Sequence, residues 1–222
     1  MAKRKKQEDF DDVFIDVVES TGDARTFLEK NGNKLLGAIG LLALLVGGYF
    51  FYKYRVQEPK QKEAVQQMFQ AQYQFDRDSF KLGLTNPGGG YPGFVDIVEQ
   101  YSGTPAGNLA NYYAAVSYLK LGDPDASLSY LKAFKPTEEL LRATKNGMLG
   151  DIAGEKGDFD SALSYYKKAV ASNLEVITPY YLKKMGLLLT KMGKKEEALK
   201  AFKEIKSKYP SSAEGVDIDK YL

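Results

Sequence analysis

The sequence contains no histidine and no cysteine. It therefore lacks the commonest general base, the thiol nucleophile, thiolate ligands for zinc and the means to form a disulfide. Serine–lysine or paired-carboxylate catalysis stays open in principle, but no Gly-x-Ser-x-Gly elbow or similar nucleophile turn occurs in the sequence. We therefore predict that the protein is not an enzyme, and we expect no catalytic site, cofactor or metal.

An excess of charge of one sign is also missing. Lys and Arg number 31 and Asp and Glu number 29, and the resulting net charge of +2 gives too weak a field to indicate nucleic acid as a partner. The 44% of hydrophobic and 27% of charged residues are typical of a folded protein, and 222 residues suffice for one or two domains.

One long uncharged run is present, LLGAIGLLALLVGGYFFY, from Leu35 to Tyr52. As a helix it would be roughly 27 Å long, close to the thickness of the hydrocarbon core of a bilayer. Aromatic residues gather at its C-terminal end, where their rings favour the headgroup region. A buried core helix is the alternative, but the length of the run favours a lipid-embedded transmembrane helix over residues 35–54. The long preceding tail and the bulky aromatic end argue against a cleaved signal peptide.

The basic residues on the two sides of this span nearly balance, so the positive-inside rule does not decide its orientation. A short tail before a large C-terminal domain is the usual layout of a signal anchor. We therefore expect the tail, residues 1–34, to be cytoplasmic and the C-terminal domain to lie on the other side of the membrane.

The tail contains a predicted amphipathic helix, EDFDDVFIDVVES. Its apolar residues follow the i, i+3, i+4, i+7 spacing of one helix face, and the other face is acidic, so anionic lipid would repel it. The helix is either a docking element for a protein partner or a weakly ordered tail, and the sequence favours neither. As a docking element it would use Phe10, Phe14 and Val17.

Three similar segments follow in the C-terminal half: LGDPDASLSYLKAF, KGDFDSALSYYKKA and MGKKEEALKAFKEI. Their glycines, Gly122, Gly157 and Gly193, are about 35 residues apart, which is the period of stacked helical hairpins. Each glycine lies between two predicted helices and marks the tight turn of a hairpin. The sequence therefore predicts three hairpins over residues 106–210.

Small residues mark where the two helices of a hairpin would cross. Gly150 and Gly186 allow close approach, and the rings of Tyr166 and Phe202 would fill the space beside them. Pro210 would end the last helix, because proline cannot continue it.

Helices are also predicted from Glu58 to Phe80 and from Phe94 to Gly103, as a degenerate first hairpin within residues 55–105. The segment between them, LGLTNPGGGYPG, with its Gly-rich part at 83–93, is predicted to be a loop but lacks the Gly-Lys-Ser/Thr ending of a phosphate-binding loop. Residues 211–222 are expected to cap the open end of the stack. The predicted fold class is all-α, with one transmembrane helix before an α-solenoid of three and a half to four helical hairpins.

The repeated segments resemble the tetratricopeptide repeat family. The resemblance is carried by Leu149, Gly150, Gly157, Ala162, Tyr166 and Ala169, and by Met185, Gly186, Gly193, Ala198, Phe202 and Pro210. It implies a tetratricopeptide-like solenoid whose concave face is lined by the first helix of each hairpin.

On the family pattern, the partner-binding face would consist of Leu109, Tyr112, Val116, Leu119, Lys120, Asp151, Glu155, Tyr180, Lys183, Leu187 and Lys191. This mixed apolar and charged surface suits an extended or partly unfolded polypeptide, or an amphipathic helix of a partner. No asparagine stands where some family members hold a C-terminal carboxylate, so we do not expect that clamp. Tyr112 and Leu187 could equally be packing residues.

A narrower similarity links the chain to the YfgM-like ancillary subunits of the bacterial SecYEG protein-export translocon. It rests on Phe27, Asn31 and Gly32 before the span and on the second repeat. This resemblance implies a single-pass inner-membrane protein with a cytoplasmic N-terminus and a periplasmic repeat domain. It also implies a chaperone-like adaptor whose protein partners are translocon subunits, a periplasmic chaperone or isomerase, and exported polypeptides. A repeat scaffold for another envelope or cytosolic assembly is the alternative.

Overall fold

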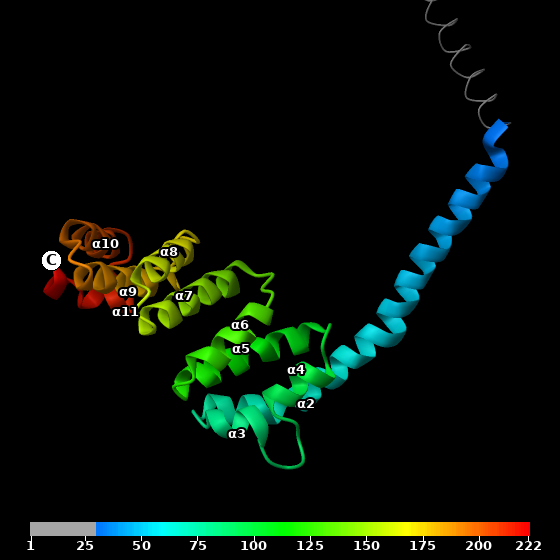
Figure 1. The fold of residues 1–222 in the computed structure, drawn as a ribbon, viewed down its shortest axis with the longest axis horizontal. Coiled ribbons are helices and arrows are strands. Elements are labelled where there is room, and N and C mark those ends of the chain that lie inside the picture. The colour runs from blue at the N-terminus through cyan, green and yellow to red at the C-terminus, as the bar shows by residue number, and fades with distance from the viewer. Residues whose placement is uncertain (1–29) are drawn as a thin grey trace, which may run out of the picture. The chain divides into compact units, whose positions relative to one another are not determined.

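The computed structural model describes residues 30–222, and every regular element in that range is a helix (Figure 1). The elements are a helix over residues 30–52, η1 (Lys53–Gln57, π-helical), α2 (Glu58–Asp76), α3 (Phe80–Thr85), α4 (Phe94–Gln100), α5 (Pro105–Lys120), α6 (Pro124–Ala133), α7 (Glu139–Glu155), α8 (Phe159–Val170), α9 (Thr178–Lys191), α10 (Lys195–Lys208), α11 (Ala213–Val216) and η2 (Ile218–Tyr221, 3-10). The predicted all-α class is confirmed.

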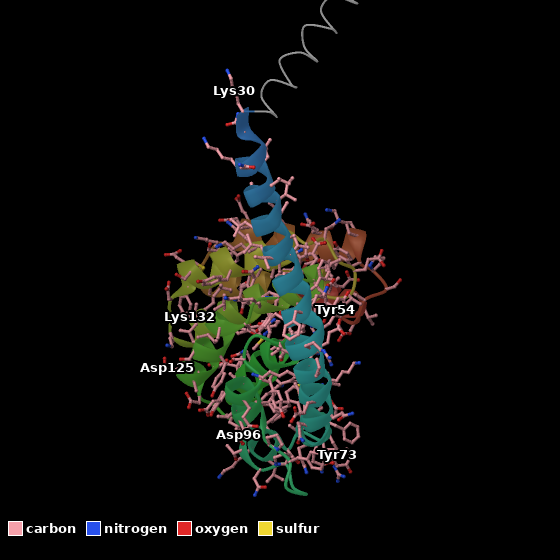
Figure 2. The ribbon with its side chains drawn as sticks, turned by 90° about the vertical axis from the view of Figure 1, so that its right-hand side faces the viewer. Lys30, Tyr54, Tyr73, Asp96, Asp125 and Lys132 are labelled. Carbon is pink, nitrogen blue, oxygen red and sulfur yellow. The ribbon has the colours of Figure 1, made fainter. Side chains whose placement is uncertain are left out.

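The apolar run belongs to one continuous helix from Lys30 to Asp76. Its most apolar window has a mean hydropathy of 2.0, and none of that window is buried inside the protein. Figure 2 shows side chains projecting outward along this helix from Lys30, and Leu44, for example, is 75% exposed. A core helix would be covered by other parts of the chain. The helix is therefore a candidate membrane anchor or signal, and within residues 30–222 it alone has the length and apolar character to cross a bilayer.

The residues from Lys60 to Leu222 form a compact unit that contains the three predicted hairpins, α5/α6, α7/α8 and α9/α10. Gly122, Gly157 and Gly193 have φ values of +79°, +79° and +76°, which glycine adopts without steric cost. In the first turn the Asp123 N–H donates to the Tyr118 carbonyl at 2.9 Å, and the same bond recurs at the other two glycines. This Schellman arrangement ends each first helix and reverses the chain.

The predicted close contacts within the hairpins are confirmed. A Cβ atom added at Gly150 would lie 2.7 Å from Cδ1 of Tyr166, and one added at Gly186 would lie 2.4 Å from Cε1 of Phe202. Both distances are shorter than a van der Waals contact. The two aromatic rings therefore occupy space that only a glycine on the facing helix leaves open.

Helices α2 and α4 pack before α5 as a degenerate hairpin. The Tyr101 hydroxyl after α4 donates to Glu63 Oε1 at 3.0 Å, while Phe94, which begins α4, meets Phe75 near the end of α2, so these two helices run antiparallel. The Gln61 Oε1 atom accepts from the Ala106 N–H at 2.8 Å near the start of both α2 and α5. Helix α2 is thus the first helix of an additional hairpin.

Two boundaries in this region differ from the prediction. The helix predicted to reach Phe80 ends at Asp76, because the chain turns through Asp78 at a φ of +56°. The predicted loop contains the end of the helix α3, Phe80–Thr85. Gly83 suggests a loop by its residue type, but here it allows close packing, since an added Cβ would lie 3.1 Å from the Ala71 carbonyl oxygen and 3.2 Å from the Phe94 ring.

The short elements α11 and η2 cover the last hairpin. Ile218 is only 1% exposed, and the Tyr221 ring stacks on Phe202 with 5.0 Å between ring centroids. Lys206 Nζ pairs with Asp219 Oδ1 at 2.6 Å. These contacts bury the apolar face that the last repeat of a solenoid would otherwise expose.

Candidate functional site

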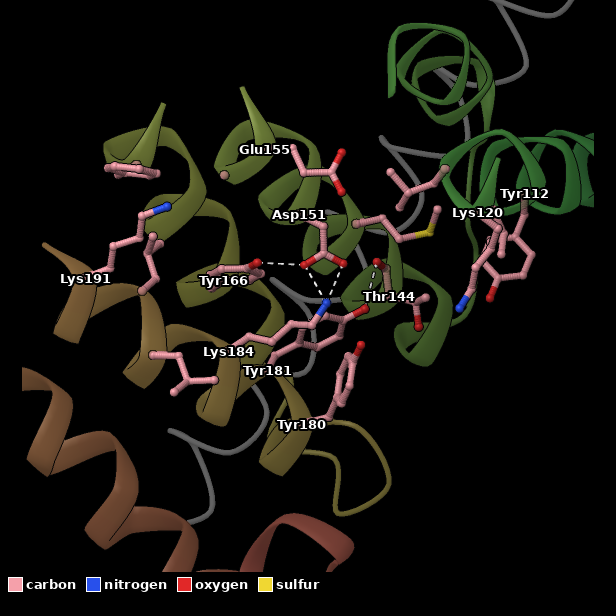
Figure 3. A pocket seen from close by; sticks show the side chains of 17 residues that line it. Tyr112, Lys120, Thr144, Asp151, Glu155, Tyr166, Tyr180, Tyr181, Lys184 and Lys191 are labelled. Carbon is pink, nitrogen blue, oxygen red and sulfur yellow. Dashed lines mark hydrogen bonds and ion pairs between the residues drawn. The ribbon is translucent and has the colours of Figure 1, made fainter. Parts of the chain in front are cut away.

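A groove of about 810 Å³ is bordered by the first helix of each hairpin, with side chains of α8 contributing to it (Figure 3). Its lining residues are Tyr112, Val116, Leu119 and Lys120 from α5; Thr144, Met148, Asp151, Gly154 and Glu155 from α7; Phe159 and Tyr166 from α8; and Tyr180, Tyr181, Lys184, Leu187, Leu188 and Lys191 from α9. The volume is in the range of ligand-binding clefts and large enough for several side chains of a partner.

The helical period explains which side chains reach the groove. Thr144, Met148, Asp151 and Glu155 are spaced by three or four residues and form one face of α7. The same spacing connects Tyr180 to Lys184, Leu187 and Lys191 on α9. Each of these helices therefore presents one stripe of side chains to the groove.

Most of the residues proposed from the family pattern lie in this groove. They are Tyr112, Val116, Leu119, Lys120, Asp151, Glu155, Tyr180, Leu187 and Lys191. Leu187 is 42% exposed there. The Tyr112 ring both lines the groove and packs near Phe134, with 5.6 Å between ring centroids. Their role in partner binding remains a prediction.

Two residues of the predicted set lie elsewhere. Leu109 packs against the core formed by α2, α4 and α5. Lys183 directs its ammonium toward the ring of Tyr221, 5.9 Å from the centroid. Phe10, Phe14 and Val17 fall outside the described residues. Lys183 differs from the groove residue Lys184 by a single position, but one position turns a side chain by about 100° around a helix.

Asp151, Lys184 and Tyr166 form a polar network in the groove. Lys184 Nζ lies 2.7 and 2.8 Å from the two carboxylate oxygens of Asp151, and the Tyr166 hydroxyl donates to Asp151 Oδ1 at 2.7 Å (Figure 3). The side chains of Lys184 and Asp151 are 30% and 17% exposed. The Lys184 ammonium also lies 4.8 Å from the centre of the Tyr180 ring. This network ties α7 to α9 and satisfies both charges internally.

The environment fixes the protonation states of this network. Burial raises the pKa of the Tyr166 hydroxyl well above its usual value of 10.0, and the hydrogen bond and charge of Asp151 raise it further. Burial and then the charge of Asp151 also raise the pKa of Tyr181. Burial acts to lower the pKa of Lys184, but the hydrogen bond and charge of Asp151 outweigh it, so the pKa is raised. At neutral pH both tyrosines are neutral and Lys184 is charged.

The remaining lining residues were not predicted to lie in the groove: Thr144, Met148, Gly154, Phe159, Tyr166, Tyr181, Lys184 and Leu188. Lys184 could have been found by counting four residues from Tyr180 along a helix. Tyr181 could not, because it serves two purposes: it is 2% exposed in the core, and its hydroxyl donates to the Thr144 carbonyl at 3.3 Å.

Within residues 30–222, no group of three or more His, Cys, Asp or Glu side chains is placed to hold a metal ion. The groove combines aromatic and aliphatic walls, an internally paired Asp151–Lys184 floor, and single charges at the rim.

Residues 25–218 match a family model described as a tetratricopeptide repeat-like domain. The match includes all the helical hairpins and the helices that border the groove. No curated protein matches the chain.

Proposed function

Because the chain belongs to the tetratricopeptide repeat-like family, we propose that it is a membrane-anchored adaptor that holds polypeptide segments of partner proteins in the groove between α5, α7 and α9. Domains of this family are scaffolds for protein–protein interaction and are typically non-catalytic. The groove supports this proposal most directly, since it joins apolar walls to a charged rim over three successive repeats.

The internal pairing of Asp151 with Lys184 favours a polypeptide over a small charged ligand. A binding site for a small ion keeps a charge free for it, whereas here each charge of the floor already has its counter-charge within 2.8 Å. The floor can therefore accept apolar side chains without leaving a buried charge unpaired.

We further propose that this adaptor works at the protein-export translocon of a bacterial inner membrane. The sequence similarity to YfgM-like subunits and the exposed apolar helix support this placement. In this proposal the helix over residues 35–54 spans the membrane, the N-terminus is cytoplasmic and the repeat domain is periplasmic. Its partners would be translocon subunits, a periplasmic chaperone or isomerase and exported polypeptides, toward which it plays a chaperone-like, non-catalytic role.

In-cell photocrosslinking tests the proposed function. A photoreactive phenylalanine analogue would replace Tyr112 or Tyr180, which line the groove, and Lys132, which is exposed on α6 outside it, would serve as the control position. We expect exported polypeptides and translocon subunits in the adducts from the two groove positions and not from Lys132. Adducts with cytosolic proteins alone would contradict the placement at the translocon and favour a scaffold of another assembly.

The orientation can be tested separately, because a cysteine-free chain allows a single engineered thiol. Ser164 is exposed on α8, so a Ser164→Cys variant offers one accessible site. A membrane-impermeant maleimide should label it in cells with a permeabilised outer membrane. Labelling only after the inner membrane is broken would place the repeat domain in the cytoplasm.

A further inference from the structure

The rim of the groove carries one charge from each of three successive repeats. Lys120 ends α5, Glu155 ends α7 and Lys191 ends α9, so they occupy the same position of the hairpin repeat. All three are exposed and line the groove, and none forms an ion pair with another described residue. In Figure 3 they follow one another from right to left as positive, negative and positive side chains.

This alternation differs from the charges of the floor. Asp151 and Lys184 neutralise each other at 2.7 and 2.8 Å, so a partner meets them as a pair. Lys191 lies over the Phe159 ring, 4.6 Å from its centroid, a cation–π contact that favours one position of the ammonium at the rim without cancelling its charge. The unpaired rim charges are therefore the groups that a partner's own charges would meet.

The spacing of the rim charges fits an extended chain. Neighbouring helices in a stack lie roughly 10 Å apart. A peptide in the extended polyproline II conformation advances roughly 3.1 Å per residue and has three residues per turn, so its side chains at i, i+3 and i+6 lie on one face. Such a peptide, when it crosses α5, α7 and α9, therefore brings one side chain of this face to each rim charge. Between the charged contacts, its other side chains would meet the apolar walls at Val116 and Leu187, which are accessible in the groove.

We propose that the groove selects an extended peptide whose charged side chains run acidic, basic, acidic at about three-residue intervals, with apolar side chains between them. This inference rests on the proposed function and adds the chemistry of the bound segment. Opposite charges would face each other at Lys120, Glu155 and Lys191, and a segment with the inverse order would place like charges together at all three positions.

Three fluorescein-labelled peptides provide the test: Asp-Leu-Phe-Lys-Leu-Phe-Asp, its inverse Lys-Leu-Phe-Asp-Leu-Phe-Lys, and the rearranged Asp-Asp-Lys-Leu-Phe-Leu-Phe. Binding to the full chain in non-ionic detergent would be followed by fluorescence anisotropy. We expect the first peptide to bind about tenfold more tightly than either of the others at low salt, because each exposed pair contributes a fraction of a kcal/mol. The preference should shrink in 0.5 M salt. The rearranged peptide has the net charge of the first, so it separates charge order from net charge.

A charge-reversed variant gives the sharper comparison. Lys120→Glu, Glu155→Lys and Lys191→Glu together should invert the preference toward the inverse peptide. The matched control is Lys132→Glu, Glu139→Lys and Lys203→Glu, which makes the same charge changes at exposed positions outside the groove and should leave the preference unchanged. Circular dichroism would check that both variants fold.

The outcomes separate this inference from the proposed function. If the native chain binds all three peptides equally and the reversed variant does the same, polypeptide binding stands and the charge order is overturned. If the native chain binds none of the peptides, the proposed groove function fails, and the inference fails with it.

Discussion

The hairpins α5/α6 and α7/α8 place their aromatic side chains differently. In α7/α8 the Tyr166 ring fills the space over Gly150, whereas in α5/α6 the corresponding residue is Ala115, which is completely buried. Leu131 stands there at the position of Tyr166 and is also completely buried, while the neighbouring Tyr130 ring stacks on Tyr118 with 5.4 Å between centroids. Ala153 takes the place of Tyr118 in the second hairpin. The same helical crossing is therefore reached with side-chain volume distributed differently between the two helices.

This difference shows that a repeat constrains total volume more tightly than residue identity. Glycine is required at this position only where an aromatic ring on the facing helix points at it, and the smaller Leu131 leaves room for the methyl group of Ala115. Single substitutions can test how far the two hairpins are interchangeable, through the change that each causes in the free energy of unfolding of the full chain in mild detergent.

The largest effect is expected for Gly150→Ala. The new methyl group would lie 2.7 Å from a Tyr166 ring that is 7% exposed and held by its hydrogen bond to Asp151, so the helices must separate or the ring must shift. We expect a loss of about 2 kcal/mol by chemical denaturation. Gly154→Ala on the same helix is the control, because its nearest neighbour would be 3.8 Å away, and it should be neutral or slightly stabilising. Equal losses in both variants would contradict the steric explanation.

Asp151→Asn should cost about 1–2 kcal/mol. It leaves the Lys184 ammonium, 30% exposed, without its counter-charge between α7 and α9. The neighbouring repeats suggest a repair, since Val116 and Met148 occupy the positions that correspond to Asp151 and Lys184. The double variant Asp151→Val with Lys184→Met should recover most of the stability in a denaturation curve. If the double variant does not recover stability, the contact between α7 and α9 requires the polar network of Asp151, Lys184 and Tyr166.

Alkaline pH should weaken the second hairpin through Tyr166. Its pKa in the folded chain is raised above 10.0, so above pH 10 the unfolded chain releases a proton that the folded chain retains. The stability linked to this hydroxyl is complete below pH 10 and is lost as the pH rises further, by about 1 kcal/mol at pH 11. Phe202 occupies the corresponding position in the third hairpin, so Tyr166→Phe should fold and should lose less stability between pH 9 and pH 11. If the Tyr166→Phe variant loses as much stability between pH 9 and pH 11 as the native chain, the loss cannot be assigned to the Tyr166 hydroxyl.

The smallest effect is expected at the surface pair of Lys156 and Asp125, which connects the first two hairpins. The Asp125 side chain is 82% exposed, so solvent screens the attraction. Lys156→Ala should change the stability by less than about 0.5 kcal/mol in the same denaturation assay. A loss comparable with that of Asp151→Asn would mean that α6 and α7 depend on this contact for their packing.

The sequence predicts those features of the fold that depend on the backbone conformation of single residues. Gly122, Gly157 and Gly193 were identified as turns because a positive φ strongly favours glycine, and all three have it. The pairing of Gly150 with Tyr166 could also be predicted, because the repeat period places them on facing helices. The prediction that Gly83 lies in a loop was wrong, because the sequence does not distinguish a glycine needed for close packing from a glycine in a loop.

The candidate groove was predicted less completely. Residues spaced along α7 and α9 could be assigned to a face once the repeat was aligned, but the alignment selected Lys183 where Lys184 enters the groove. The partnership of Lys184 with Asp151 joins residues of two different repeats. No period within one helix encodes such a pair, because it depends on how neighbouring repeats are rotated against each other.

The wall of the groove is made of three helices that belong to three different hairpins, and this arrangement has a mechanical consequence. If the stack of hairpins bends, the opening between these three helices should widen or narrow. A peptide segment bound across all three helices would resist such bending. A force that straightens the stack would in turn lower the affinity for the bound segment. The domain would then behave as a spring whose stiffness depends on whether the groove is occupied.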